Sequence, residues 1–160
     1  IIDITDRVCA EGWNWHAWPT PKGIWYARRG LSLGNGRQRP LGLHHAVLGV
    51  SSATEIDHVD RNPLNCRRSN LRFATSHQNA MNRGVRSDTQ CHYKGVGLRS
   101  ENNRWRARIV VNGRRVSLGS YHTPEGAARV YDAAARKHFG EYAVFNFPDE
   151  LDKFPCAENV

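Results

Sequence analysis

Apolar and basic residues alternate most regularly in the last third of the chain. Along 104–111 the apolar side chains are separated by three arginines, Arg104, Arg106 and Arg108. Such alternation predicts a half-buried strand with one apolar face and one basic face. Asn112-Gly113, a turn pair typical of β-hairpins, connects this run to a similar one over 115–121. Together with a short run over 95–99, the pattern predicts a three-stranded antiparallel sheet.

A helical period follows this predicted sheet. Thr123 and Pro124 are typical first residues of a helix, and small apolar residues recur at helical spacing until Gly140. Because most of these residues are alanines, the helix can lie close to the apolar face of the sheet. The pattern therefore predicts one helix packed on the three strands.

Shorter elements are predicted in the N-terminal half. Aromatic runs on both sides of Pro21-Lys22-Gly23 predict a β-hairpin, and we expect its tryptophans to form the small core of this half. The glycine-rich stretch 30–40 is expected to be a loop. A short helix is predicted over 43–48, ended by Gly49.

Polar residues of a different kind mark the middle of the chain. Asp57 and His58 are adjacent on a short predicted strand, so they point to opposite faces unless the backbone bulges. Asn70 opens a second strand over 71–75, and Asn79 falls in the first turn of a short helix capped by Thr75 or Ser76. The order is strand with Asp-His, loop with Asn, strand, and helix with Asn.

This order resembles that of the HNH nucleases, whose ββα-metal finger carries its functional residues on the same elements. The phrases Asp57-His58, 65–72 and 78–83 look like those of homing endonucleases. An imidazole suits the deprotonation of water near neutral pH, which makes His58 the candidate general base. Asp57 and Asn79 would bind a divalent metal, Mg²⁺ or Mn²⁺, through oxygen. Asn70 would orient the ring of His58.

Each of these residues also has an ordinary structural interpretation. Asp57, Asn70 and Asn79 could be turn, cap and surface residues if each is considered alone. A non-catalytic DNA-binding protein with a relic finger is the alternative to an enzyme, although the intact set of four residues argues against it. His44 matches a histidine of similar homing endonucleases, and the sequence leaves open whether it packs in the interior or lies near a phosphate.

The charge points to a polyanionic partner. The formal net charge is +8, and nine basic residues against two acidic ones lie between Arg83 and His122. The sequence over 93–148 resembles the plant ethylene-response-factor (Apetala-type) DNA-binding domain, in which a sheet contacts DNA. That resemblance and the basic pattern together indicate DNA contacts by Lys94, Arg99, Arg104, Arg106, Arg108 and Arg115, by Arg86 of a basic linker, and by Arg67, Arg68 and Arg72 of the finger.

Departures from the plant pattern limit what this resemblance implies. Gly97, Arg108 and Ser117 stand where plant members use arginine, glutamate and tryptophan, so their GCC-box preference is not transferred. The expected partner is double-stranded DNA. Duplex RNA is disfavoured because its deep major groove excludes a reading sheet.

The whole chain is expected to have an α+β fold in two modules. The predicted boundaries are 1–83 for an HNH nuclease domain with an N-terminal β-hairpin and ββα-metal finger, 84–92 for the basic linker, 93–148 for the three-stranded sheet packed on one helix, and 149–160 for an acidic tail. The four cysteines form no Cys-x-x-Cys pair, which indicates reduced thiols. Without a signal-peptide pattern or a membrane-spanning run, we expect an intracellular protein with no membrane contact and no obligate protein partner.

Overall fold

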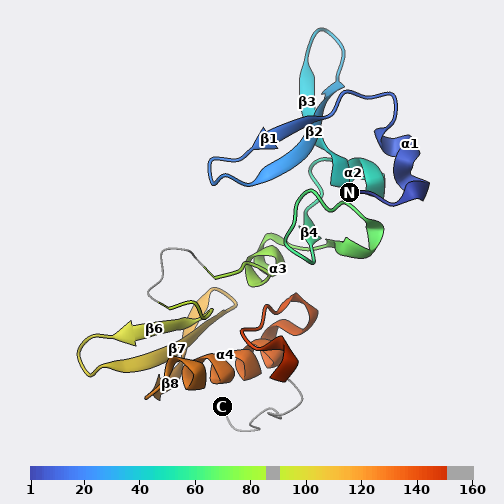
Figure 1. Ribbon diagram of the computed structural model, residues 1–160. Helices are drawn as coiled ribbons and strands as arrows, with labels where there is room; N and C mark the ends of the chain where they lie inside the picture. Colours follow the sequence, from blue (N-terminus) through green and yellow to red (C-terminus); the bar gives the residue numbers. More distant parts are fainter. Residues whose placement is uncertain (86–90, 151–160) are drawn as a thin grey trace. The chain divides into compact units, whose positions relative to one another are not determined.

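The computed structural model describes residues 1–85 and 91–150 (Figure 1). Its contacts divide the chain into two compact units, Ile1–Asn79 and Ala80–Val160, each with its own core. The fold is mixed α+β, with antiparallel sheets and a long C-terminal helix, as the sequence predicts. Among the described residues, no helix is both long and apolar enough to cross a bilayer.

The first unit begins with short helical turns and a three-stranded sheet. The turns are η1 (Ile4–Asp6) and α1 (Arg7–Ala10), and the strands are β1 (His16–Pro19), β2 (Trp25–Ser32) and β3 (Gln38–Gly42). The hairpin between β1 and β2 confirms the prediction around Pro21-Lys22-Gly23. The predicted loop over 30–40 is wrong, because most of it pairs as β2 and β3, from Arg28–Gly42 to Ser32–Gln38.

The tryptophans of this sheet do not form its core. Trp13, Trp18 and Trp25 are each at least half exposed, and only Trp15 packs against the core of the unit. That core instead consists of Leu43, Val47, Cys66 and Leu71. The expectation of a tryptophan core was wrong because alternation around a turn locates a hairpin and does not reveal which face other elements cover.

The elements that follow carry the candidate active site. They are α2 (Leu43–Leu48), β4 (Ile56–His58), η2 (Arg68–Asn70), β5 (Leu71–Phe73) and α3 (Ser76–Met81). Gly49 ends α2 in the left-handed conformation with φ of 68°, as predicted. Thr75 caps α3 with a reciprocal pair of bonds, in which its Oγ1 accepts from the Gln78 amide and its own amide donates to Gln78 Oε1.

The second unit is a three-stranded antiparallel sheet packed on one helix. Strands β6 (Val96–Arg99), β7 (Arg104–Val111) and β8 (Arg114–Tyr121) lie in that order, and α4 (Pro124–Phe139) lies against the sheet (Figure 1). Thr123 Oγ1 accepts from the Gly126 amide and so caps α4. The turns η3 (Gly140–Tyr142) and η4 (Pro148–Glu150) follow.

The core of the second unit lies between sheet and helix. Ala107 and Ile109 of β7 are buried against alanines of α4, which confirms the predicted close approach. The register shifts between Ala107 and Arg108, where Ala107 pairs with Gly119 but Arg108 pairs with Ser117. This bulge, which the alternation does not predict, leaves Leu118 outside the one-to-one pairing of β7 with β8.

Candidate functional site

Asp57 and His58 lie side by side on β4 and are both buried, with 8% and 7% of their surfaces exposed. Strand β5 pairs with β4 so that Asp57 faces Arg72 and His58 faces Leu71 in the register. Both Nε and Nη2 of Arg72 donate to Asp57 Oδ2, over 2.9 and 2.6 Å. A buried carboxylate thus stands beside a buried imidazole and is held by a guanidinium.

The ring of His58 packs among other rings. Its centroid is 5.1 Å from that of His44, with an edge-on angle of 81°, and Tyr26 approaches both histidines edge-on at 6.0 and 6.4 Å. Burial lowers the pKa of His58, although Asp60 and Asp57 oppose that shift. Burial also lowers the pKa of His44 to about 3, helped by the charges of its neighbours. Both rings are therefore suited to be neutral at pH 7.

Asn70 shapes the loop after His58 and does not hold the ring as predicted. Its Oδ1 accepts from the Asp60 amide at 2.9 Å, and its Nδ2 donates to Asp60 Oδ1 and to the Asn65 carbonyl, each at 2.8 Å. Its carbonyl also accepts from the Val59 amide. These bonds use both amide hydrogens of Asn70, so its contribution is to fix the backbone that leaves β4.

Asp60 is the centre of that loop. It also accepts from the Asn62 amide and from Asn65 Nδ2. Partial burial would raise the pKa of the Asp60 carboxyl, but the hydrogen bonds from Asn65, Asn62 and Asn70 outweigh it, so the pKa falls below its usual value. The carboxylate therefore stays charged and keeps the loop in shape.

Asn79 lies in the first turn of α3, as predicted, and is half-buried. Its amide donates to the Thr75 carbonyl, which fixes its place in that turn. The binding of one ion by Asn79 and Asp57 together stays a prediction.

The three arginines of the finger form ion pairs within the unit. Arg72 is bound to Asp57, and Arg68 reaches the buried Asp6 with three bonds and the Val47 carbonyl with a fourth. Arg67 lies 4.0 Å from Asp3 and is exposed. The fold thus gives Arg68 and Arg72 structural partners that the sequence does not reveal, and contact with phosphate stays a prediction for all three.

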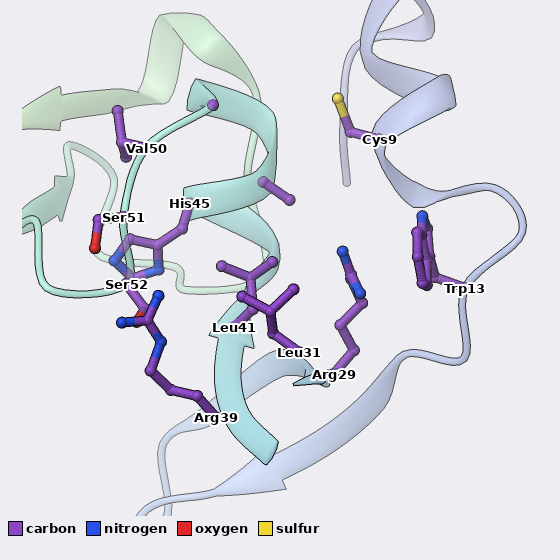
Figure 2. A pocket seen from close by; sticks show the side chains of 12 residues that line it. Cys9, Trp13, Arg29, Leu31, Arg39, Leu41, His45, Val50, Ser51 and Ser52 are labelled. Atoms are coloured by element: carbon purple, nitrogen blue, oxygen red, sulfur yellow. The ribbon is translucent and has the colours of Figure 1, made fainter. Parts of the chain in front are cut away.

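His44 and its neighbour His45 have different surroundings. His44 is buried, with 8% of its surface exposed, and its contact with a phosphate stays a prediction. His45 instead lines a hollow of about 420 Å³, into which Arg29 and Arg39 also project, near Ser51 and Ser52 (Figure 2). Of the two histidines, His45 is the one that lines this open hollow, together with two arginines and several apolar residues.

Cys66 was not among the predicted site residues, yet its thiol lies close to both buried histidines. The ligating atoms of His44, His58 and Cys66 all lie within 4.8 Å of one another. Burial raises the pKa of the Cys66 thiol to about 11. Because these residues come from α2, β4 and the loop before η2, no local spacing in the sequence points to them.

The second unit presents the predicted basic face on its sheet. Arg108 and Arg115 are exposed, and Arg104 and Arg106 are partly so. Partial burial, together with the charges of Arg106 and Arg115, lowers the pKa of Arg108. These guanidiniums therefore repel one another, which an anion would relieve.

Other predicted DNA contacts have partners within the protein. Arg99 pairs with Glu101 at 3.0 Å, Arg104 bonds with the ring of His122, and the ammonium of Lys94 donates to the Met81 carbonyl. Arg86 lies outside the described residues. DNA contact by each of these residues stays a prediction.

Two family models match the chain in the positions that the geometry suggests. The HNH endonuclease model matches residues 47–81, which include β4, β5 and α3, and the AP2 domain model matches residues 91–141, which include the sheet and α4. The two matches do not overlap and follow the order expected from the sequence.

Individual relatives are similar to one or both parts. An uncharacterized HNH endonuclease, L560, from Acanthamoeba polyphaga mimivirus is 39% identical over 103 residues, which cover 64% of this chain and 51% of the relative. The ethylene-responsive transcription factor ERF015 from Arabidopsis thaliana is 51% identical over 65 residues, 39% of this chain and 33% of the relative.

A phage protein is matched over more of its own length. Protein 3.8 of Escherichia phage T7 is 31% identical over 90 residues, which cover 56% of this chain and 74% of the relative. By contrast, the chain spans about half of the mimivirus relative and a third of the plant one. The finger, the sheet and these matches together identify an HNH endonuclease segment at residues 47–81 and an AP2 domain at residues 91–141 of this chain.

Proposed function

We propose that this protein is a metal-dependent endonuclease of the homing type, which hydrolyses phosphodiester bonds of double-stranded DNA at a site selected by its AP2 domain. The observation that carries this proposal is the buried pair Asp57 and His58 on β4, with Asp57 held by Arg72. Burying a carboxylate and an imidazole costs stability. Two apolar residues could fill the same place without this cost, so the presence of the pair favours a functional role.

His58 is the proposed general base. Its ring is suited to be neutral at pH 7, because burial lowers its pKa. A neutral ring nitrogen accepts the proton of a water molecule while the water oxygen bonds to phosphorus and the bond from phosphorus to the 3′-oxygen breaks. The packing of His44 and Tyr26 around the ring limits its movement.

Asp57 and Asn79 are the proposed ligands of a divalent cation. Their donor set, one carboxylate and one amide oxygen, fits Mg²⁺ or Mn²⁺, and Mg²⁺ is commonly held by few protein oxygens. When bound, such an ion stabilises the charge that develops on the phosphate and on the leaving oxygen. Arg72 keeps Asp57 oriented, and its positive charge also weakens the hold of Asp57 on a cation in the absence of DNA.

The AP2 sheet is the proposed reader of duplex DNA. The face of this sheet opposite the helix carries Arg106, Arg108 and Arg115, and β-strands of a protein can enter the major groove of B-DNA. One arginine can also donate two hydrogen bonds to the major-groove edge of a guanine. The AP2 domain would fix the position on DNA, and the finger would cut.

A plasmid assay tests the catalytic part of this proposal. Supercoiled plasmid incubated with the protein and Mg²⁺ should be converted to nicked or linear forms, and chelation of the metal by EDTA should stop the conversion. Sequencing the product ends from a library of random sites would then test the homing part, because a single recurring site is expected. Protein that shifts the DNA on a gel but never cuts it would favour the alternative, a DNA-binding protein with a relic finger.

A further inference from the structure

His44, His58 and Cys66 form a cluster of three potential metal ligands in the first unit. All three are buried, with 8%, 7% and 0% of their surfaces exposed, and their ligating atoms lie within 4.8 Å of one another. A tetrahedral zinc ion, with bonds of about 2.0 Å to nitrogen and 2.3 Å to sulfur, would space these atoms roughly 3.5 Å apart. Binding of such an ion would therefore draw the most distant of these atoms closer together.

The donor atoms of this cluster differ in kind from those proposed for catalysis. Two imidazole nitrogens and one sulfur suit zinc and similar transition ions, whereas Mg²⁺ prefers oxygen. Three protein ligands would also leave a fourth position open for water, as in zinc sites that are not purely structural.

We propose that His44, His58 and Cys66 bind a borderline-soft divalent ion of the zinc class, and that the bound ion withdraws His58 from its role as a base. Binding replaces the thiol proton of Cys66, which passes to solvent as the sulfur bonds to the metal. The inhibitory consequence rests on the proposed nuclease function, whereas the metal site itself does not.

The residues around the cluster affect the position of its side chains and the local charge. Gly42 permits the position of His44, because a Cβ there would lie 2.6 Å from Cε1 of that ring. The Cys66 thiol donates to the Pro63 carbonyl at 3.6 Å, which orients the buried sulfur. The nearby charge of Arg28 opposes a cation, and the thiolate formed on binding offsets that charge.

Cobalt is the direct probe of this site. The full chain, freed of metal with a chelator, is titrated with Co²⁺, and we expect a thiolate-to-cobalt charge-transfer band together with the strong visible bands of four-coordinate cobalt. Excess Mg²⁺ should leave these bands unchanged, whereas Zn²⁺ should remove them. The absence of a charge-transfer band at millimolar Co²⁺ would overturn the proposal.

Variants assign the band to the cluster. Cys66→Ala should abolish it, and Cys9→Ala, which changes a cysteine outside the cluster, should retain it. Because Cys66 is a core residue, His44→Asn is the second variant, and it should weaken the cobalt affinity at least tenfold while far-ultraviolet circular dichroism shows a folded chain. A band that survives in folded Cys66→Ala or is unchanged in His44→Asn would contradict the site.

Cleavage in Mg²⁺ tests the consequence. Equimolar Zn²⁺ should slow plasmid cutting by the wild type at least tenfold, and Cys66→Ala should cut equally well with and without Zn²⁺. If Cys66→Ala remains as sensitive to Zn²⁺ as the wild type, inhibition through this cluster is wrong. Failure of the nuclease proposal would look different, because no cutting would occur with or without Zn²⁺ while the cobalt bands persisted.

Discussion

Arg72 and Asp57 are register partners across β5 and β4, and Arg72 donates twice to the same carboxylate oxygen, Oδ2, over 2.9 and 2.6 Å. Their side chains are only 14% and 9% exposed, so this ion pair is screened little by water. The residue proposed to bind the catalytic metal is therefore oriented before any ion arrives.

Removing that guanidinium should destabilise the first unit. Arg72→Ala leaves a buried carboxylate without its guanidinium partner, and breaking a buried ion pair in this way costs about 3 kcal/mol or more. Urea denaturation should show this loss in the free energy of unfolding. Arg67→Ala is the matched control, because the exposed pair with Asp3 at 4.0 Å should contribute less than about 1 kcal/mol. Equal effects of the two variants would contradict the importance of the Arg72–Asp57 pair.

Asn70 should act through the loop after β4. Asn70→Ala removes three side-chain hydrogen bonds, with an expected loss of about 2 to 4 kcal/mol, and exposes the Asp60 amide to exchange. Hydrogen exchange followed by NMR measures that amide directly. Asn62→Ala, which removes one exposed side-chain bond, should cost less than about 1.5 kcal/mol. If the Asp60 amide exchanged equally slowly in Asn70→Ala, Asn70 would not fix this loop.

Gly95 should be intolerant of any side chain. Its φ is 76°, and a Cβ there would lie 2.0 Å from the ring of Tyr131 and 2.7 Å from the Arg108 carbonyl. Gly95→Ala should therefore destabilise the second unit by about 3 kcal/mol, from both backbone strain and overlap. Thermal unfolding measures the change. Gly97→Ala meets no atom within 4 Å and should change stability by less than about 1 kcal/mol. A similar melting temperature for both variants would count against the packing described for Gly95.

Arg108 should contribute to DNA affinity through charge. If about six phosphates are contacted, the logarithm of the binding constant should fall with the logarithm of salt concentration with a slope near −5. Arg108→Ala should weaken binding and make that slope shallower by about one, as measured by fluorescence anisotropy at several salt concentrations. Lys137→Ala, which changes an exposed residue of α4, should leave the slope unchanged. An unchanged slope in Arg108→Ala would remove this residue from the DNA-binding surface.

The sequence predicts the second unit better than the first. Asn112-Gly113, the Thr123 cap and the alternation along β7 are local signals, and the fold follows all three. The first unit differs from the prediction at positions whose structure is determined by tertiary contacts. Three such features are the exposure of Trp18, the pairing of β3 and the partners of Asn70. Each depends on how separate elements pack against one another, and a single sequence does not carry that information.

The candidate site likewise contains residues that the sequence reveals and residues that only the fold reveals. Asp57 and His58 are found from their neighbours in the sequence, since the finger is a continuous segment. Cys66 and His44 come together only through the packing of α2 against the loop before η2, so their proximity to His58 could not be predicted. Local chemistry is readable from the sequence, whereas clusters assembled from separate elements require the fold.

The central claim is that His58 deprotonates the attacking water in a DNA-cutting enzyme. The most direct test compares the initial rates at which wild type, His58→Ala and the exposed control His77→Ala convert supercoiled plasmid in Mg²⁺, with DNA affinity measured alongside. The account predicts that His58→Ala lowers the rate by about 10²-fold or more while it binds DNA as tightly as the wild type, and that His77→Ala cuts normally. Cutting by His58→Ala at the wild-type rate would contradict it.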